Sequence, residues 1–345
     1  MSALSPPLRP AAISAALVAW FRKSGRDYPW RRTCDPYAVL VSEVMLQQTQ
    51  ISTVLDRGYY ARWLERFPDF ETLASAREDE VLKAWEGLGY YRRARSLHRL
   101  AKVVKEKHGG VFPQDRDAIL ALPGIGPYTA GAVASFAFGL PEPLVDGNVA
   151  RVLSRIHDDA TPVDSTAGVK LLWERAGALV RSADDPRALN SALMELGQTY
   201  CTPAKPACDG CPVRLQCHAT EPETLPVKRA RQVITAVTEH VFFLRTRDGV
   251  LLEQETGKRR TGLWKLPALP AAHEGKPPPV LMRANYVITR YKVALWVHEA
   301  PARQSRWPDT HRVIAFAEIE STPMPAPYRR ALSLLLNRGE FRLAG

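Results

Sequence analysis

No segment of the 345-residue sequence approaches the roughly 18 consecutive apolar residues that a membrane-spanning helix needs. The first 30 residues also lack a basic leader followed by a long apolar run, which a secretory signal would show. Internal repeats are absent, and the only low-complexity tract is the short KPPPV. The sequence therefore predicts a soluble, cytoplasmic, globular protein, and its length favours two domains.

Cysteine is scarce, with five residues in the chain, yet four of them fall within a 17-residue stretch. A disulfide framework would not leave the rest of a long chain so poor in cysteine, so this spacing indicates a metal site. Only one C-x2-C pair is present and prolines surround it, so an iron–sulfur cluster and a zinc ion both stay open. The four are Cys201, Cys208, Cys211 and Cys217, whereas the distant Cys34 is expected to be a free thiol.

The formal charge of +11 favours an anionic partner such as nucleic acid, although a basic enzyme without one can show the same balance. Apolar residues recur at helical spacing from about residue 11 to 218, which predicts an all-helical domain. Residues 219–232 are polar and contain proline, as a linker does. From residue 233, β-branched and polar residues alternate around an Asp248-Gly249 turn, which predicts a smaller β-rich domain ending in a helix over 326–339.

The segment LPGIGPYTAG, residues 122–131, separates two helical runs and carries almost no reactive side chain. Gly124 and Gly126 permit backbone angles that are closed to other residues, and Pro127 suits the first turn of a helix. A tight hairpin is therefore expected. It is either an ordinary turn between helices or a site where exposed backbone amides bind a nucleic-acid phosphate.

Two carboxylates stand next to apolar helical patterns. Glu43 in VSEVMLQQTQ has apolar neighbours, so we expect it to be partly buried with a raised pKa, which suits a general acid. Asp146 in VDGNVARVLSR stands at the N-cap position of a helix, a role that needs no catalytic function. Taken singly, each has an adequate structural explanation.

Six features in this order resemble one family: SEVMLQQTQ, WEGLGYYRRARSL, LPGIGPYTAGA, VDGNV, MELGQTYCTP and the cysteine spacing. They are similar to the MutY adenine DNA glycosylases of the helix-hairpin-helix superfamily, over roughly residues 21–217. The resemblance implies a helical glycosylase domain over 1–218, with the helix-hairpin-helix at about 115–139 and a 4Fe–4S cluster on the loop 201–217. A linker over 219–232 and a Nudix-like lesion-recognition domain over 233–345 would follow.

The resemblance implies a monomeric, monofunctional enzyme that removes undamaged adenine opposite 8-oxoguanine or guanine in double-stranded DNA, in a bacterial-type cytoplasm. Glu43 would protonate the departing base, Asp146 would stabilise the oxocarbenium-like sugar, and Tyr128 and Asn148 would orient these groups. The related endonuclease III enzymes carry lysine at the position of Tyr128, where it forms a Schiff base that a phenol cannot form. The Tyr128 hydroxyl is expected to hydrogen-bond near Asp146.

Further positions follow from the same resemblance in two sets. The adenine pocket would comprise Arg26, Trp30, Leu46 and Glu195, of which Trp30 and Leu46 are equally well explained as core residues. The DNA-binding residues would be Gln48 and Tyr90, which push into the duplex, with Gly124, Gly126, Thr289 and Arg290.

The C-terminal part departs from the family pattern. TGLWKLPALP resembles a strand of the Nudix-like domain, but no glutamate-rich helix of the REUxEE type follows Pro270, so a binding module without hydrolase activity is expected. The H-x-F-S/T-H loop of many relatives is best matched by YVITR, where Tyr286 and Arg290 replace the histidines. Thr289 keeps a hydroxyl that can bond the lesion, so 8-oxoguanine recognition stays the expectation, with weaker discrimination from guanine.

Two other functions compete with this interpretation. One is a bifunctional, endonuclease III-like glycosylase and lyase for oxidised pyrimidines, against which Tyr128 and the additional C-terminal domain speak. The other is a cluster-bearing redox sensor that binds DNA without catalysis, which would have no use for Glu43 and Asp146 in their motifs.

Overall fold

The computed structural model describes residues 8–229, 234–257, 260–270, 278–288, 290–301 and 307–337. These residues form two compact units. The first falls within Met1–Thr53, Phe67–Ala74 and Arg99–Arg231, and the second within Val54–Arg66, Ser75–His98 and Gln232–Gly345. The fold class is therefore the predicted one, a helical domain together with a smaller β-rich part, whereas the boundaries at 218 and 233 stay predictions. Within the described ranges no helix is long and apolar enough to cross a bilayer.

The first unit is built from helices. An apolar core lies between α1, α10, α11 and α12, where Leu17, Val152, Leu179 and Leu193 are buried together. Several of these helices begin with proline in the first turn or with a carboxylate or hydroxyl at the N-cap, as at Asp35. Proline has no N–H that would be left unpaired there, and the N-cap oxygen accepts from a free backbone amide. The helices are α1 (Pro10–Ser24), α2 (Pro36–Leu46), α5 (Phe70–Ser75), α8 (Arg116–Leu120), α9 (Pro127–Phe138), α10 (Gly147–Ile156), α11 (Thr166–Arg181) and α12 (Pro186–Thr199).

The predicted hairpin joins α8 and α9. Gly124 adopts a φ of +80°, and Pro127 is the first residue of α9. Gly126 has a φ of −108°, which other residues also adopt, so only Gly124 uses the conformational freedom of glycine. A Cβ added to Gly131 would lie 2.0 Å from the Pro143 carbonyl oxygen, so α9 packs closely on the segment that leads into α10.

Residues 85–91 of the second unit separate two helices. These are α6 (Glu78–Ala84) and α7 (Arg92–His108), and α7 continues into the first unit from Arg99. The turn between them holds three residues with positive φ, Gly87, Gly89 and Tyr90, and this conformation ends a helix. α3 (Ile51–Asp56) and α4 (Tyr59–Arg66) precede it, and the Trp63 and Trp85 rings pack edge to face.

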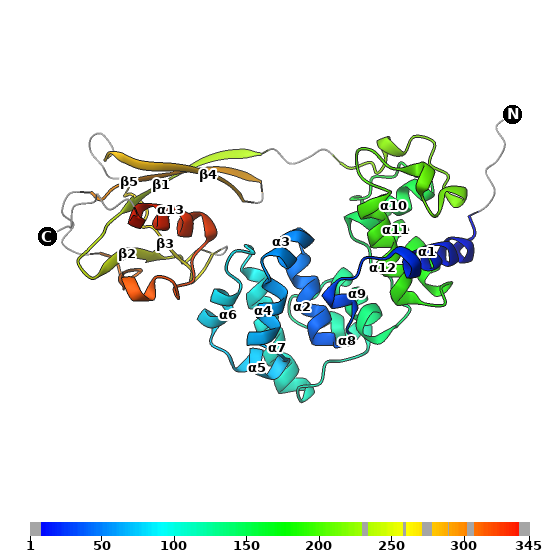
Figure 1. The fold of residues 1–345 in the computed structure, drawn as a ribbon, viewed down its shortest axis with the longest axis horizontal. Helices are drawn as coiled ribbons and strands as arrows, with labels where there is room; N and C mark the ends of the chain where they lie inside the picture. The colour runs from blue at the N-terminus through cyan, green and yellow to red at the C-terminus, as the bar shows by residue number, and fades with distance from the viewer. Residues whose placement is uncertain are drawn as a thin grey trace. The chain divides into compact units, whose positions relative to one another are not determined.

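Two three-stranded sheets complete the second unit, in the orders β1-β5-β4 and β3-β2-β6. The strands are β1 (Thr235–Phe243), β2 (Gly249–Gln254), β3 (Trp264–Lys265), β4 (Val280–Ile288), β5 (Tyr291–Glu299) and β6 (His311–Ala315). Helix α13 (Ala326–Asn337) lies between the sheets (Figure 1), where Tyr328 and Leu332 join the core formed by both. The Asp248-Gly249 turn is present, but the two strands that it connects lie in different sheets. β1 pairs in parallel with β5, whereas β2 pairs with β6. The C-terminal helix predicted to begin at residue 326 is confirmed as α13.

Candidate active site

Glu43 lies on α2 among apolar residues and is only 5% exposed. Its Oε2 accepts a hydrogen bond of 2.8 Å from the Tyr128 hydroxyl. Burial raises the pKa of Glu43 from 4.5 to about 7, and the nearby charge of Asp146 adds to the rise, while Tyr128 and Arg31 oppose it. The carboxyl therefore holds a proton close to neutral pH, as the apolar sequence around it predicts.

Tyr128 reaches this carboxyl from the first turn of α9, directly after the hairpin. Burial, with the charges of Glu43 and Asp146, raises the pKa of the phenol, so Tyr128 stays a hydrogen-bond donor. Its hydrogen bond goes to Glu43, and the charge of the nearby Asp146 also acts on the phenol. The bond to Glu43 follows from the packing of α9 against α2, which carries this glutamate.

Asp146 caps the N-terminus of α10. Its Oδ1 accepts from the Val149 amide at 2.7 Å, and its Oδ2 accepts from the Asn148 side-chain amide at 2.9 Å. The partial positive charge of a helix N-terminus favours an anion at this position. One residue thus serves as a structural N-cap and still presents a carboxylate close enough to raise the pKa of Glu43.

Arg151 extends this chain of hydrogen bonds away from Asp146. It is 7% exposed, and its Nη2 donates to Asn148 Oδ1 at 2.9 Å and to the Gly197 carbonyl. Its Nε donates to the carbonyl oxygen of Cys201 at 2.8 Å. Asp146, Asn148 and Arg151 therefore connect the candidate site to the backbone of the first clustered cysteine. The sequence motifs did not single out Arg151, although it follows Asn148 by three residues, the spacing of one helical face.

A second buried carboxylate, Glu195 on α12, is 1% exposed. It accepts from the backbone amide of Arg26 at 2.9 Å and from Nη1 of Arg31 at 2.5 Å. The Arg31 guanidinium also lies 4.9 Å from the ring centroids of both Phe21 and Tyr28. Because its charge also lowers the pKa of Glu43, Arg31 belongs to the site, and the sequence prediction missed it.

The other predicted pocket residues are Arg26, Trp30 and Leu46. The Arg26 side chain donates to the Tyr28 hydroxyl, so only its backbone contacts Glu195. Trp30 is 9% exposed and stacks on Tyr28 with ring centroids 5.2 Å apart, which fits a core role as well as a pocket role. Leu46 is the last residue of α2 and is half-buried.

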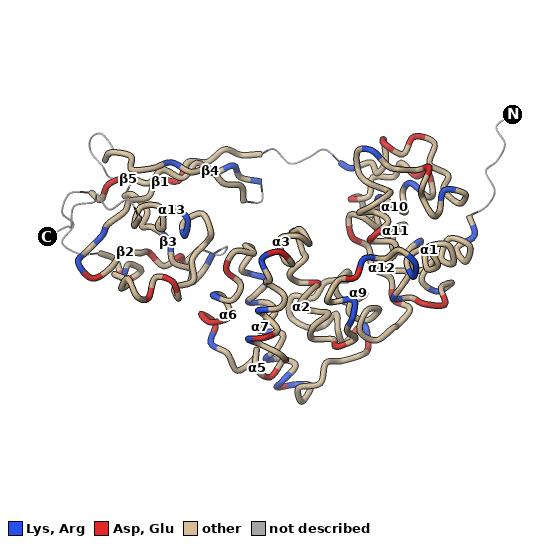
Figure 2. Tube along the Cα trace, in the orientation of Figure 1, with Lys and Arg blue, Asp and Glu red and all other residues tan. Residues whose placement is uncertain are grey.

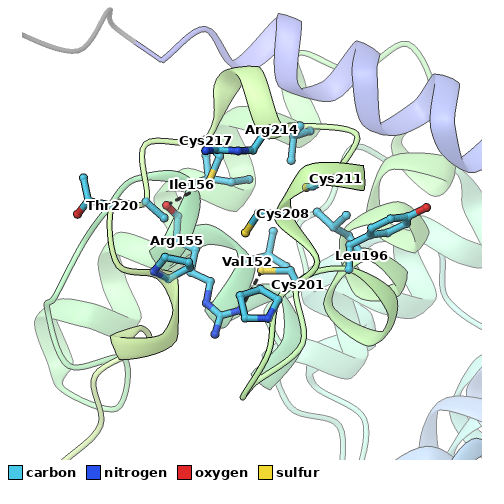
Figure 3. Close-up of a pocket in the computed structure, with 15 residues that line it drawn as sticks. Val152, Arg155, Ile156, Leu196, Cys201, Cys208, Cys211, Arg214, Cys217 and Thr220 are labelled. Carbon is cyan, nitrogen blue, oxygen red and sulfur yellow. Dashed lines mark hydrogen bonds between the residues drawn. The ribbon is translucent and has the colours of Figure 1, made fainter.

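The four clustered cysteines border one pocket of about 160 Å³ (Figure 3). Arg155, which is 1% exposed, donates from Nη1 to the Cys201 sulfur at 3.4 Å and to the Thr202 carbonyl at 2.7 Å. No group of three or more histidine, cysteine or acidic residues in the described ranges is placed to hold a single metal ion. Four thiols that line one pocket are a donor set that suits either a zinc ion or an iron–sulfur cluster.

Comparison with known proteins identifies related sequences and folds. Residues 41–174 match the family of HhH-GPD superfamily base excision DNA repair proteins. The adenine DNA glycosylase of Homo sapiens is 45% identical over 219 residues, 61% of this chain and 40% of that protein. That of Buchnera aphidicola subsp. Baizongia pistaciae (strain Bp) is 35% identical over 254 residues, 72% of this chain and 70% of that protein.

The chain belongs to the adenine DNA glycosylase family. Its match spans about two fifths of the length of the human and rodent members. Among solved structures, a thermostable thymine-DNA glycosylase is 32% identical with a TM-score of 0.55, covering 61% of this chain and 96% of that one. An endonuclease III trapped on DNA, at 24% identity and a TM-score of 0.50, covers 61% of this chain and 97% of that one and shows the shared helical fold.

In this member of the adenine DNA glycosylase family, the predicted DNA-binding residues are divided between the two units. Gln48, just after α2, is exposed with a φ of +56°, and the glycines of the hairpin lie in the same unit. Tyr90 is exposed in the second unit, next to α7, along which basic residues recur (Figure 2).

The predicted lesion-reading segment lies at the turn between β4 and β5 of the second unit. Arg290 is exposed, and its guanidinium lies over the Tyr291 ring. Tyr286, the first residue of YVITR, donates from its hydroxyl to Glu239 at 2.7 Å. Thr289 lies outside the described residues.

Proposed function

We propose that this chain is a monofunctional adenine DNA glycosylase that excises adenine opposite 8-oxoguanine or guanine in base excision repair. The observation that carries the proposal is the pair formed by Tyr128 and Glu43. A buried carboxyl with a pKa of about 7 can deliver a proton at neutral pH. A phenol stands where a lyase of this superfamily would need an amine.

The chemistry follows from the two carboxylates. Protonated Glu43 donates its proton to a ring nitrogen of the departing adenine, so the base leaves in neutral form. Asp146, the N-cap of α10, stabilises the positive charge that develops on the sugar. Glu43, now ionised, accepts a proton from the attacking water. Asn148 fixes Asp146 through its side-chain amide, and Tyr128 fixes Glu43.

A 4Fe–4S cluster is the cofactor that we propose for the pocket between the clustered cysteines. Cys201, Cys208, Cys211 and Cys217 would supply four thiolates, which is the usual ligand set. The buried Arg155 and the neighbouring Arg214 provide positive charge beside a group that is anionic when bound by thiolates. Bound there, it would brace the loop against α10.

The base and its partner are inferred from the relatives and from the C-terminal part. Curated relatives at 30–45% identity are named adenine DNA glycosylases, which supports adenine over thymine. The turn between β4 and β5, with Thr289 and Arg290, is the proposed reader of 8-oxoguanine. Such an enzyme would work as a monomer on duplex DNA in the cytoplasm, at the nucleoid.

The test is single-turnover release of base from duplexes with adenine opposite 8-oxoguanine, guanine, cytosine or thymine. Duplexes with thymine opposite guanine and with thymine glycol are assayed beside them. Fast loss of adenine opposite 8-oxoguanine, with strand cleavage only after alkali and no borohydride-trapped complex, is expected. Release of thymine alone, or trapping by borohydride, would overturn the assignment, whereas equal rates opposite guanine and 8-oxoguanine would remove only the lesion preference.

A further inference from the structure

Tyr90 is an exposed aromatic residue in a backbone conformation that tyrosine rarely adopts. Its side chain is 44% exposed, and its φ is +45°. A left-handed backbone is unfavourable for any residue with a Cβ, so the surroundings must hold it there. The proposed function assigns Tyr90 to insertion into the duplex, where its orientation before contact matters.

The turn that carries Tyr90 is fixed on both sides. Trp85 is fully buried and donates from Nε1 to the Gly89 carbonyl at 3.0 Å. A Cβ on Gly87 would lie 2.0 Å from the Tyr59 hydroxyl, so the turn is packed directly against this tyrosine. Tyr91 is 4% exposed and donates to the Met324 carbonyl at 3.0 Å. The backbone below Tyr90 is therefore held in one conformation.

The ring of Tyr90 has its own support, the guanidinium of Arg93. This group lies 5.4 Å from the Trp85 ring centroid and 5.5 Å from the Tyr90 ring centroid, so it contacts a buried ring and an exposed one. Its Nη2 donates to the Leu88 carbonyl at 3.1 Å, and its backbone amide donates to the Tyr90 carbonyl at 2.8 Å. A planar guanidinium on an aromatic face gains cation–π and stacking energy that an ammonium matches less well.

We propose that Arg93 is a positioning residue that holds the Tyr90 ring in the orientation in which it enters the DNA duplex. The inference rests on the proposed function, because it concerns the step at which that enzyme opens the mispair. Arg93 is half-buried, and burial lowers the pKa of its guanidinium to about 10, so the group stays charged at neutral pH. Holding the ring beforehand reduces the ordering that DNA binding would otherwise require.

The experiment uses the full-length holoenzyme and a double-mutant cycle. Wild type, Arg93→Met, Tyr90→Ala and the double variant are compared by single-turnover adenine release and by the fluorescence of a 2-aminopurine placed beside the 8-oxoguanine. We expect Arg93→Met to lower the release rate roughly tenfold and to remove most of the fluorescence rise that marks unstacking. In the Tyr90→Ala background, Arg93→Met should cost nothing further, because the ring that it positions is gone.

Arg92→Met is the matched control, since it removes the same charge from the exposed neighbouring position. It should weaken binding to mispaired and matched duplexes alike, in a salt-dependent way, and keep the fluorescence rise. Arg93→Lys guards against misfolding: it keeps the charge without the planar group, and it should show the loss of fluorescence with a normal melting temperature. Additive losses in the cycle, or a full fluorescence rise in Arg93→Lys, would refute the inference. Failure of the wild type to release adenine would refute the proposed function instead.

Discussion

Replacing Glu43 by glutamine should abolish base release and at the same time make the folded chain more stable at alkaline pH. The amide has the shape of the protonated carboxyl, and its carbonyl oxygen can still accept the hydrogen bond from Tyr128. It cannot donate an acidic proton to the base. The variant also removes the cost of keeping an ionised carboxylate in a site that is 5% exposed.

The size of the effect follows from the pKa of Glu43, which burial raises from 4.5 to about 7. Below the ordinary value of 4.5, folded and unfolded chains are both protonated and the carboxyl carries no penalty. The penalty grows as the pH rises and is complete above about 7, where it reaches about 3.4 kcal/mol at about 1.4 kcal/mol per pKa unit. At about pH 5.5 it is only about 1.4 kcal/mol, because the folded chain still holds the proton.

The assay is urea denaturation of the holoenzyme, wild type against Glu43→Gln, at about pH 5.5 and about pH 8.5. The free energy of unfolding should increase in the variant at both values, by roughly 2 kcal/mol more at the higher one. Glu65→Gln, an exposed glutamate of α4, is the control and should show no pH-dependent difference. A gain of equal size at both pH values, or a loss at about pH 8.5, would mean that Glu43 is not a buried acid with a raised pKa.

Three further outcomes are expected. Tyr128→Phe removes a hydrogen bond that lowers the pKa of Glu43, so the alkaline limb of the single-turnover pH–rate profile should move to higher pH; a shift to lower pH would contradict the geometry. Arg151→Met leaves Asn148 and the carbonyl oxygens of Gly197 and Cys201 without their charged donor. This change should cost roughly 3 kcal/mol of stability by urea denaturation and slow adenine release, and unchanged values would show that the chain of hydrogen bonds carries no function. Cys211→Ser should lower the iron content from roughly four atoms per chain, measured by elemental analysis, and undiminished iron would place the cofactor elsewhere.

Local patterns in the sequence predict much of the fold and the candidate carboxylates. Helical spacing predicts the helical character of the first unit, and Pro127 and Asp146 mark the starts of α9 and α10. Apolar neighbours predict the burial of Glu43. The break between α6 and α7 was not predicted, because the sequence analysis found helical spacing across this whole region. The structure shows that Gly87, Gly89 and Tyr90 adopt positive φ between the two helices.

Contacts between residues that are far apart in the chain could not be predicted from the sequence. Arg31 belongs to the site because it pairs with the buried carboxylate of Glu195, which comes from α12, far along the chain. Arg155 likewise contacts a distant segment, since it donates to the Thr202 carbonyl of the cysteine loop. Arg31 stands in no quoted motif, and Arg155 is only the last residue of VDGNVARVLSR. A surface arginine would give the same local sequence signal. In the second unit, the predicted turn at Asp248-Gly249 is present, but β1 pairs with β5 (Tyr291–Glu299) and not with β2.

The parallel pairing of β1 with β5 determines when the strands of the second unit can pair during synthesis. During synthesis β1 leaves the ribosome well before β5, so its hydrogen-bonding edge waits for a partner while the intervening strands are still being added. The apolar faces of both sheets then wait for α13, which contributes Tyr328, Leu332 and Leu335 to their shared core. Translation that halts before α13 would leave two exposed sheet faces, so such products should depend on chaperones and be rapidly degraded.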